Sequence, residues 1–451
     1  MRRSSTSSPT TARRRRLAPA AGMIALLMGA APAAQDDPWP GPPDVGDGVG
    51  ARALAEARRT WSDSASWKAR SGRIRRHLAR TLRLDPFPAA GEVGFETTGR
   101  RELDGYAVSN VRFETMPGLF VHANVYEPAA SEGPRPLVLR SHGHFRGTDT
   151  DPEGRFQGDV QRLAGLLARG GAVVITWDMM GWGGPQHQTK AQRCEHHSPP
   201  GCLDRPGVEQ PHQATHRRPE TTALQTFNSM RILDAALEHL DVDPGRVAMT
   251  GSSGGGTQTF LATALDPRIH VCAPVVMVSA HFFGGCDCES GLPIHAVPED
   301  AQGPRLRTSN VEFAALAAPR PQLLVSVGGD WTRNTPEVEY PYVRDVYRAL
   351  GAPGAVGNAH FADEQHDYGP SKRRAVVAFL ADALGLDGAA MLGPDGLLLE
   401  SPLTVLDRSQ LTATTPSHPL PPRALAGDDA VWRAFVELER PAARRAAPNG
   451  R

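Results

Sequence analysis

The pattern of hydrophobic and polar positions changes near residue 100. Residues 51–83 carry apolar side chains in a helical pattern, which predicts helix with one inner face. From Val108 onward, short apolar runs alternate with longer amphipathic stretches, which is typical of a domain built from strands and helices. The inner positions expected in the first stretch are Leu54, Trp61, Trp67, Ile74, Leu78 and Leu82.

The apolar runs predict the strands of a sheet. The runs 108–115 and 119–126 flank Pro117-Gly118 and predict an antiparallel hairpin. The further strands then alternate with helices, which predicts a mostly parallel sheet covered on both faces. The predicted fold class is therefore α/β, and a leading hairpin suits the α/β-hydrolase arrangement. The remaining strands are predicted over 136–140, 172–177, 246–250, 270–278, 322–327 and, with the weakest pattern, 353–358, and the helices over 157–169, 219–240, 255–264, 337–350 and 371–384.

Two regions interrupt the alternation. Residues 183–218 are rich in histidine and proline, and residues 281–308 contain Cys286-Asp287-Cys288-Glu289. Long irregular insertions of this kind are candidates for loops or lids at an active site. Together these patterns divide the chain into a signal peptide at 1–33, a linker at 34–50, an N-terminal helical extension at 51–100, a catalytic domain at 101–387 and a C-terminal extension at 388–451.

Composition narrows the class of protein. The chain has 451 residues, of which 40% are hydrophobic and 22% charged, and this balance excludes collagen, a coiled coil and a polytopic membrane protein. Lysine plus arginine and aspartate plus glutamate each number 49, so the formal net charge is zero. Zero net charge gives no electrostatic reason to expect a nucleic-acid partner. The sequence leaves the oligomeric state open.

The charge is unevenly distributed. Residues 1–20 contain six arginines and no acidic residue, and an apolar run ending in Ala31-Pro32-Ala33 follows. A basic start, a short apolar stretch and small residues at its end are typical of a secretory signal, against the alternatives of an irregular tail or a single membrane anchor. Cleavage after about Ala33 leaves a chain near −6 on the same count. We therefore expect a secreted or periplasmic protein with no stable membrane insertion after cleavage.

The cysteines fit an exported protein. Cys194 and Cys202 are close enough in sequence to close a short loop as a disulfide. Together with His196 and His197 they also offer zinc-ligand types, but their spacing matches no closed zinc finger. Cys272 lies in an apolar run and is expected to be buried. We therefore predict no metal site and no cofactor.

The strongest chemical signal is the sequence Gly251-Ser252-Ser253-Gly254-Gly255. It has the form G-x-S-x-G, follows an apolar run and precedes a predicted helix. In a nucleophile elbow, the serine stands on a strand-to-helix turn so tight that bulky neighbours would clash, hence the flanking glycines Gly251 and Gly255. Ser253 is the predicted nucleophile. Ser252 is the alternative, but Thr250 would replace its first glycine.

A serine nucleophile needs a base. In the α/β-hydrolase arrangement, the acid and then the histidine follow the serine along the chain. His366 precedes a helix that begins near Ser371, which is where the base is expected. It fits this position better than His360, which lies nearer the end of a strand.

The base in turn needs an acid to orient it. The acid is expected after the parallel strand that precedes the histidine, and Asp330 follows the run 322–327. Asp287 and Glu289 are the competing acids.

The tetrahedral intermediate of acyl transfer needs two N–H donors. One is expected from Gly254, directly after the nucleophile, and the other from His144 in the loop after strand 136–140. A rival interpretation makes His142, His144 and His122 metal ligands, but no acidic partner accompanies them. The histidines therefore favour an oxyanion hole over a metal site.

These motifs together resemble a known family. The chain is similar to bacterial acetyl xylan esterases and cephalosporin deacetylases, and more broadly to dienelactone hydrolases. The resemblance extends from about residue 51 to 387 and implies a triad of Ser253, Asp330 and His366. The motifs that carry it are Ser141-His142-Gly143-His144, Asp178-Met179-Met180-Gly181-Trp182-Gly183, Gly251 to Gly255, Gly329-Asp330-Trp331 and His366-Asp367-Tyr368-Gly369.

We therefore expect a secreted serine esterase that hydrolyses short acyl esters, such as acetyl esters on a polysaccharide. Trp182, Trp331 and Glu289 flank the expected site and are candidates to bind substrate, although buried packing is the alternative for the tryptophans. A glucuronoyl esterase or serine peptidase of the same fold, a carbohydrate-binding protein without activity and a zinc hydrolase remain alternatives.

Overall fold

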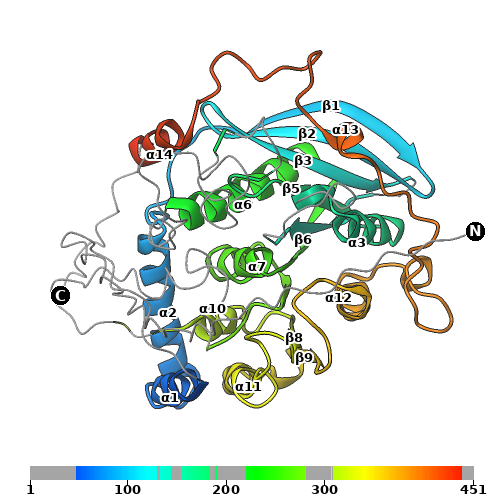
Figure 1. Cartoon of the computed structure of the whole chain (residues 1–451). Coiled ribbons are helices and arrows are strands. Elements are labelled where there is room, and N and C mark those ends of the chain that lie inside the picture. The colour runs from blue at the N-terminus through cyan, green and yellow to red at the C-terminus, as the bar shows by residue number, and fades with distance from the viewer. Residues whose placement is uncertain are drawn as a thin grey trace, which may run out of the picture. The chain divides into compact units, whose positions relative to one another are not determined.

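A nine-stranded mixed sheet forms the centre of the fold (Figure 1). The computed structural model describes residues 47–129, 133–143, 154–182, 188–189, 220–280, 306 and 308–438. The strand order is β1-β2-β3-β5-β4-β6-β7-β8-β9. The strands are β1 (Gly94–Leu103), β2 (Tyr106–Met116), β3 (Leu119–Pro128), β4 (Arg135–Ser141), β5 (Val173–Trp177), β6 (Val242–Ser252), β7 (Val271–Val275), β8 (Gln322–Val327) and β9 (Val356–Phe361).

The sheet has an antiparallel and a parallel part. Strands β1, β2 and β3 pair antiparallel with one another, and β3 pairs antiparallel with β5. From β5 through β4, β6, β7 and β8 to β9 every pair is parallel. The predicted α/β class and the leading hairpin are confirmed, and the arrangement is that of an α/β hydrolase.

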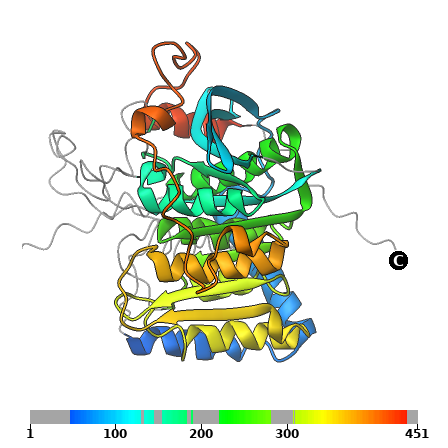
Figure 2. The same ribbon diagram turned by 90° about the vertical axis from the view of Figure 1, so that its right-hand side faces the viewer.

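Helices cover both faces of the sheet (Figures 1 and 2). On one face, α3 and α12 pack against alternate strand residues such as Val138 and Val325. On the other, α6, α7, α10 and α11 cover the residues between them, such as Leu139 and Leu324. The alternation follows from the strand geometry, because successive side chains point to opposite faces. The helices are α1 (Asp47–Arg58), α2 (Ser64–Thr81), α3 (Gly158–Arg169), α6 (Glu220–His239), α7 (Gly254–Leu265), α10 (Asn310–Ala315), α11 (Glu339–Ala349), α12 (Pro370–Leu384), α13 (Arg408–Leu411) and α14 (Asp428–Glu437), with short 3₁₀ turns at Gly154–Phe156, Pro353–Ala355 and Gly388–Ala390.

The stretch predicted as helix over 51–83 forms two helices, α1 and α2, joined by a short turn. All six predicted inner side chains of this stretch are buried. Asp63 caps α2 by accepting from the Ser66 N–H, and the Ser66 hydroxyl in turn accepts from the Asp63 N–H. This capping box explains why the chain breaks and restarts as a new helix there.

Strand β1 is not visible in the hydrophobic pattern. It occupies Gly94–Leu103 and therefore spans the boundary expected between a helical extension and the catalytic domain at 100/101. The expected extension over 51–100 is thus helical only in its first part. The strand lies at the edge of the sheet and carries partly and fully exposed side chains along its length, so it shows no buried alternation.

Residues beyond Leu384 return across the antiparallel part of the sheet. The buried Arg112 on β2 donates to the carbonyl oxygens of His418 and Pro419 at 3.1 and 2.8 Å. The buried Arg155 donates to the Leu411 carbonyl at 2.7 Å. Buried guanidinium groups need such acceptors, so this C-terminal segment is part of the hydrolase core.

Several predictions concern residues outside the described ranges. These are the signal peptide at 1–33, most of the linker at 34–50, the Cys194/Cys202 pair and the loop with Cys286 and Glu289. Within the described residues, Cys272 is free and buried, as predicted. In the same part of the chain, no helix has both the length and the apolar character needed to span a bilayer.

Two leucine substitutions test whether the C-terminal segment is packed into the core. Leu411 is fully buried and Leu397 is 57% exposed. We expect Leu411→Ala to lower the free energy of unfolding by about 2–5 kcal/mol, because it leaves a cavity in the core. Leu397→Ala, the control, should change it by less than about 0.5 kcal/mol. Urea unfolding of both variants measures the difference, and equal effects would show that the segment packs only loosely.

Candidate active site

Ser253 stands on a strained turn between β6 and α7. Its backbone angles, φ 55° and ψ −125°, lie in a region that non-glycine residues rarely adopt. The N–H of Ser253 donates to the Val275 carbonyl at 3.0 Å, which ties the turn to the end of β7. Ser253 is partly exposed, whereas the neighbouring Ser252 is fully buried. The strained geometry is that of a nucleophile elbow.

The glycines around Ser253 allow three chain segments to meet. A Cβ atom on Gly251 would lie 2.5 Å from the Ser141 carbonyl oxygen, and one on Gly255 would lie 2.3 Å from the same atom. At the following residue, a Cβ on Gly256 would lie 2.7 Å from the Cβ of Met277. The Ser141 hydroxyl also donates to the Gly255 carbonyl at 2.8 Å. Only glycine permits this approach, so the elbow is locked against the end of β4.

The start of α7 offers an N–H donor beside Ser253. Gly254 is the first residue of the helix, and the first N–H groups of a helix have no acceptor within it. They also carry the positive end of the helix dipole. Gly254 is therefore placed to stabilise an oxyanion. His144, the other predicted donor, lies outside the described residues.

His142 orients the loop that leads toward residue 144. Its Nε2 accepts from the Met179 N–H at 3.0 Å, so its Nδ1 carries the proton and donates to the Gly143 carbonyl at 2.7 Å. His122, another histidine of the alternative metal site, has a protein partner, since its Nε2 lies 2.9 Å from the Thr414 hydroxyl. Among the described residues, no group of three histidine, cysteine or acidic side chains could hold a metal ion.

Asp330 and His366 are joined by a short hydrogen bond. The Nδ1 of His366 lies 2.6 Å from Oδ2 of Asp330. The other carboxylate oxygen, Oδ1, accepts from the N–H and the hydroxyl of Thr332 at 2.6 and 2.5 Å. The Asp330 side chain is 2% exposed. The carboxylate is therefore held from both sides and fixes the orientation of the imidazole.

Lys372 fixes the loop that carries His366. This buried lysine donates to Glu364 at 2.6 Å and to Asp367 at 2.7 Å. Glu364 precedes His366 in the chain and Asp367 follows it. Burial acts to raise the pKa of Glu364, but hydrogen bonds from Lys372 and Ser371 outweigh it, and the pKa lies below its ordinary value. The lowered pKa keeps Glu364 ionised at neutral pH, so its ion pair with Lys372 holds the loop.

The three predicted catalytic side chains come from the same edge of the sheet. Ser253 follows β6, Asp330 follows β8 and His366 follows β9. The carboxyl ends of parallel strands lie at one edge, where α/β proteins bind their ligands. His360, the alternative base, instead lies within β9, and its Nδ1 is 2.9 Å from the Ser326 hydroxyl.

The tryptophans predicted to bind substrate occupy different positions. Trp331 is partly buried, and its ring centroid lies 4.3 Å from that of His366. Trp182 is 1% exposed and packs edge-on against His142, which is the structural alternative considered for it. Glu289, the third candidate, lies outside the described residues.

Sequence reasoning did not identify Thr332 or Lys372. A signal exists for Thr332, because an aspartate commonly accepts from the N–H two residues later in a turn. No comparable signal exists for Lys372, because its role depends on the path of the loop after β9.

Comparisons with known proteins agree with this geometry. The family model for acetyl xylan esterase (AXE1) matches residues 95–284. The structure of the methylesterase BT1017 is similar over 87% of this chain and 81% of that one, with 34% sequence identity and a TM-score of 0.71. The hydrolase YtaP of Bacillus subtilis is 26% identical over 227 residues, which cover 49% of this chain and 67% of that protein.

The sheet order, the strained serine and the aspartate–histidine pair at the carboxyl edge define an α/β hydrolase. The similarity to BT1017 extends this assignment over most of the chain. The chain belongs to the acetyl xylan esterase (AXE1) family, a family of carbohydrate esterases.

The contact between Gly255 and Ser141 can be tested by one methyl group. We expect Gly255→Ala to lower the free energy of unfolding by about 3 kcal/mol or more, because its Cβ would overlap the Ser141 carbonyl. A Cβ on Gly354 has no atom within 4 Å, so Gly354→Ala should change stability by less than about 1 kcal/mol. Thermal and urea unfolding measure both, and a Gly255→Ala variant as stable as the control would contradict the close approach.

Proposed function

We propose that this protein hydrolyses carboxylic esters through a triad of Ser253, His366 and Asp330. The observation that carries the proposal is the short hydrogen bond from His366 to the buried Asp330, at the sheet edge where the strained Ser253 also stands. The strained turn exposes the serine hydroxyl, and the buried carboxylate fixes the imidazole tautomer in which Nε2 carries no proton and can act as the base.

In the first half of the proposed reaction, the Ser253 oxygen attacks the ester carbonyl and His366 Nε2 accepts the hydroxyl proton. The oxyanion that forms is stabilised by the Gly254 N–H and, as the second proposed donor, the N–H of His144. The carbon–oxygen bond to the alcohol then breaks, and His366 returns the proton to the departing alcohol. The products of this half are the free alcohol and an acyl group on Ser253.

In the second half, water replaces the alcohol. His366 accepts a proton from water, whose oxygen attacks the acyl carbonyl through the same oxyanion geometry. The bond to Ser253 then breaks, His366 returns the proton to the serine oxygen, and the carboxylic acid is released. Asp330 keeps its negative charge throughout and stabilises the imidazolium that forms twice in the cycle.

The comparisons favour a small ester group carried by a carbohydrate, with two possible orientations. In an acetyl ester the sugar is the alcohol, as the name acetyl xylan esterase states for the family. In a methyl ester the sugar would supply the acid, and the 34% identical BT1017 is a methylesterase. We propose the methyl ester as the preferred substrate, because the similarity to BT1017 covers more of this chain than the family model does. A polymeric substrate outside the cell also fits the proposed signal peptide at 1–33.

Replacement of the nucleophile tests the mechanism. We expect Ser253→Ala to reduce hydrolysis of p-nitrophenyl acetate at least about a thousandfold while the protein stays folded, since the acyl-enzyme cannot form. Labelling by a fluorophosphonate should disappear in the same variant. Ser252→Ala is the matched control and should keep most of the activity. Unchanged turnover in Ser253→Ala would overturn the triad, and absence of any turnover or labelling in the wild type would favour a binding protein of the same fold.

The released small product identifies the orientation of the ester. We expect the wild-type protein to release methanol from a methyl-esterified uronic acid polymer faster than acetate from acetylated xylan, with both activities lost in Ser253→Ala. Methanol and acetate can be measured by NMR in the same reaction series. Faster release of acetate would assign the sugar to the alcohol side instead.

A further inference from the structure

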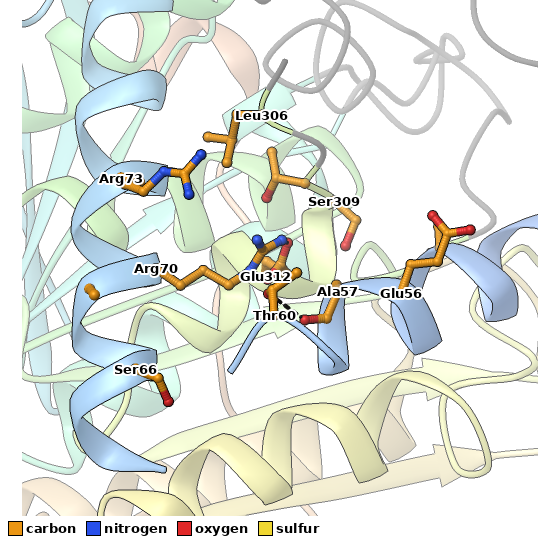
Figure 3. A pocket seen from close by; sticks show the side chains of 12 residues that line it. Glu56, Ala57, Thr60, Ser66, Arg70, Arg73, Leu306, Ser309 and Glu312 are labelled. Carbon is orange, nitrogen blue, oxygen red and sulfur yellow. Dashed lines mark hydrogen bonds and ion pairs between the residues drawn. The ribbon is translucent and has the colours of Figure 1, made fainter. Parts of the chain in front are cut away.

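A second cavity lies away from the catalytic residues, between α1, α2 and the segment that leads into α10 (Figure 3). Its volume is about 490 Å³, which falls within the range of small-molecule sites. The triad residues do not line it. The residues that line it are Ala53, Glu56, Ala57, Thr60, Ser66, Ala69, Arg70, Arg73, Leu306, Thr308, Ser309 and Glu312.

One wall of the cavity is a closed ion pair. Arg70 donates to both carboxylate oxygens of Glu312 at 2.6 Å, and the Tyr342 hydroxyl donates to the same carboxylate at 2.8 Å. Both members of the ion pair are almost fully buried. A bidentate pair of this kind is rigid and neutral overall. It therefore gives the cavity a fixed polar wall without a net charge.

Two buried hydroxyl groups in the cavity are unpartnered. Oγ1 of Thr308 and Oγ of Ser309 have no hydrogen-bond partner among the described residues, although Ser309 is only 9% exposed. The other hydroxyls behave differently, since Thr60 donates to the Ala57 carbonyl and Ser66 belongs to the cap of α2. A buried hydroxyl without a partner is costly, so this pair points to a ligand that supplies donors and acceptors.

Arg73 supplies a cation that no described residue neutralises. It is exposed, and it makes no hydrogen bond or ion pair with the described part of the chain. In Figure 3, Arg73 and Arg70 both extend from α2 toward the cavity, while Glu56 lies on the opposite side. A carboxylate can pair with Arg73. Ligands with several negative charges are disfavoured by the acidic side chain of Glu56.

We propose that this cavity binds a sugar acid, a hydroxylated ring with one carboxylate. The carboxylate pairs with Arg73, ring hydroxyls exchange hydrogen bonds with Thr308 and Ser309, and the apolar face of the ring contacts Leu306 and the alanines. The choice of ligand rests on the proposed function, because hydrolysis of a methyl ester on a sugar leaves a sugar carboxylate. The cavity would then bind the de-esterified polymer that the active site has released.

Binding can be measured without turnover. Titration of the full-length Ser253→Ala protein with glucuronate, followed by calorimetry or NMR, should show saturable binding. Arg73→Gln in the same background should weaken it about tenfold, which is the expected loss of one charged hydrogen-bonded partner. Arg76→Gln, an exposed arginine of the same helix outside the cavity, is the matched control and should leave affinity unchanged. Glucose, which lacks the carboxylate, should bind at least about tenfold more weakly.

A second variant separates binding from folding. Because the Ser309 hydroxyl has no partner in the described structure, Ser309→Ala should keep or raise stability while it weakens glucuronate binding about fivefold. Affinity that stays unchanged in Arg73→Gln, or equal binding of glucose or inorganic phosphate, would overturn the proposal. Hydrolysis of p-nitrophenyl acetate by the single variant Arg73→Gln should match the wild type, so failure of the cavity and failure of the triad give different results.

Discussion

The contact between the ends of β4 and β6 places the reacting groups. Gly251 and Gly255 bring their backbone so close to the Ser141 carbonyl that neither position has room for a side chain. This contact fixes the turn at Ser253 against the start of the loop that follows β4. The turn then sets the direction of α7, whose first N–H groups lie beside the serine. A rigid backbone junction therefore accounts for both the exposed Ser253 and the helix N–H next to it.

Asp330 and His366 are also held in fixed positions, but by side-chain contacts instead of a backbone junction. Thr332 holds one oxygen of Asp330 and His366 holds the other. Lys372 secures the histidine loop from the following helix. Positional precision of this kind is needed because a general base must lie within hydrogen-bond reach of the proton that it accepts. The site thus combines a strained strand-to-helix turn with two loops anchored by buried polar contacts.

The sequence was sufficient to predict the parallel strands, the helices between them except α10, and the loops that carry Ser253, Asp330 and His366. Those features leave local signals, such as glycines around a serine or an acid directly after a strand. Strand β1 left none, because its side chains are exposed or half-buried and the hydrophobic alternation is missing. The cavity near Arg73 was also beyond prediction, because it depends on how two helices pack against a segment more than 200 residues away.

The C-terminal segment has a consequence for how the protein is made. Arg112 and Arg155 belong to the first half of the chain, yet their acceptors are carbonyl groups of Leu411, His418 and Pro419. Until those residues have been made, Arg112 on β2 and Arg155 in the turn before α3 lack these acceptors. The first half of the chain therefore reaches its final packing only after residues 411–419 have been made. A chain cut before residue 411 would leave both guanidinium groups without these acceptors, so we expect its core to pack less stably.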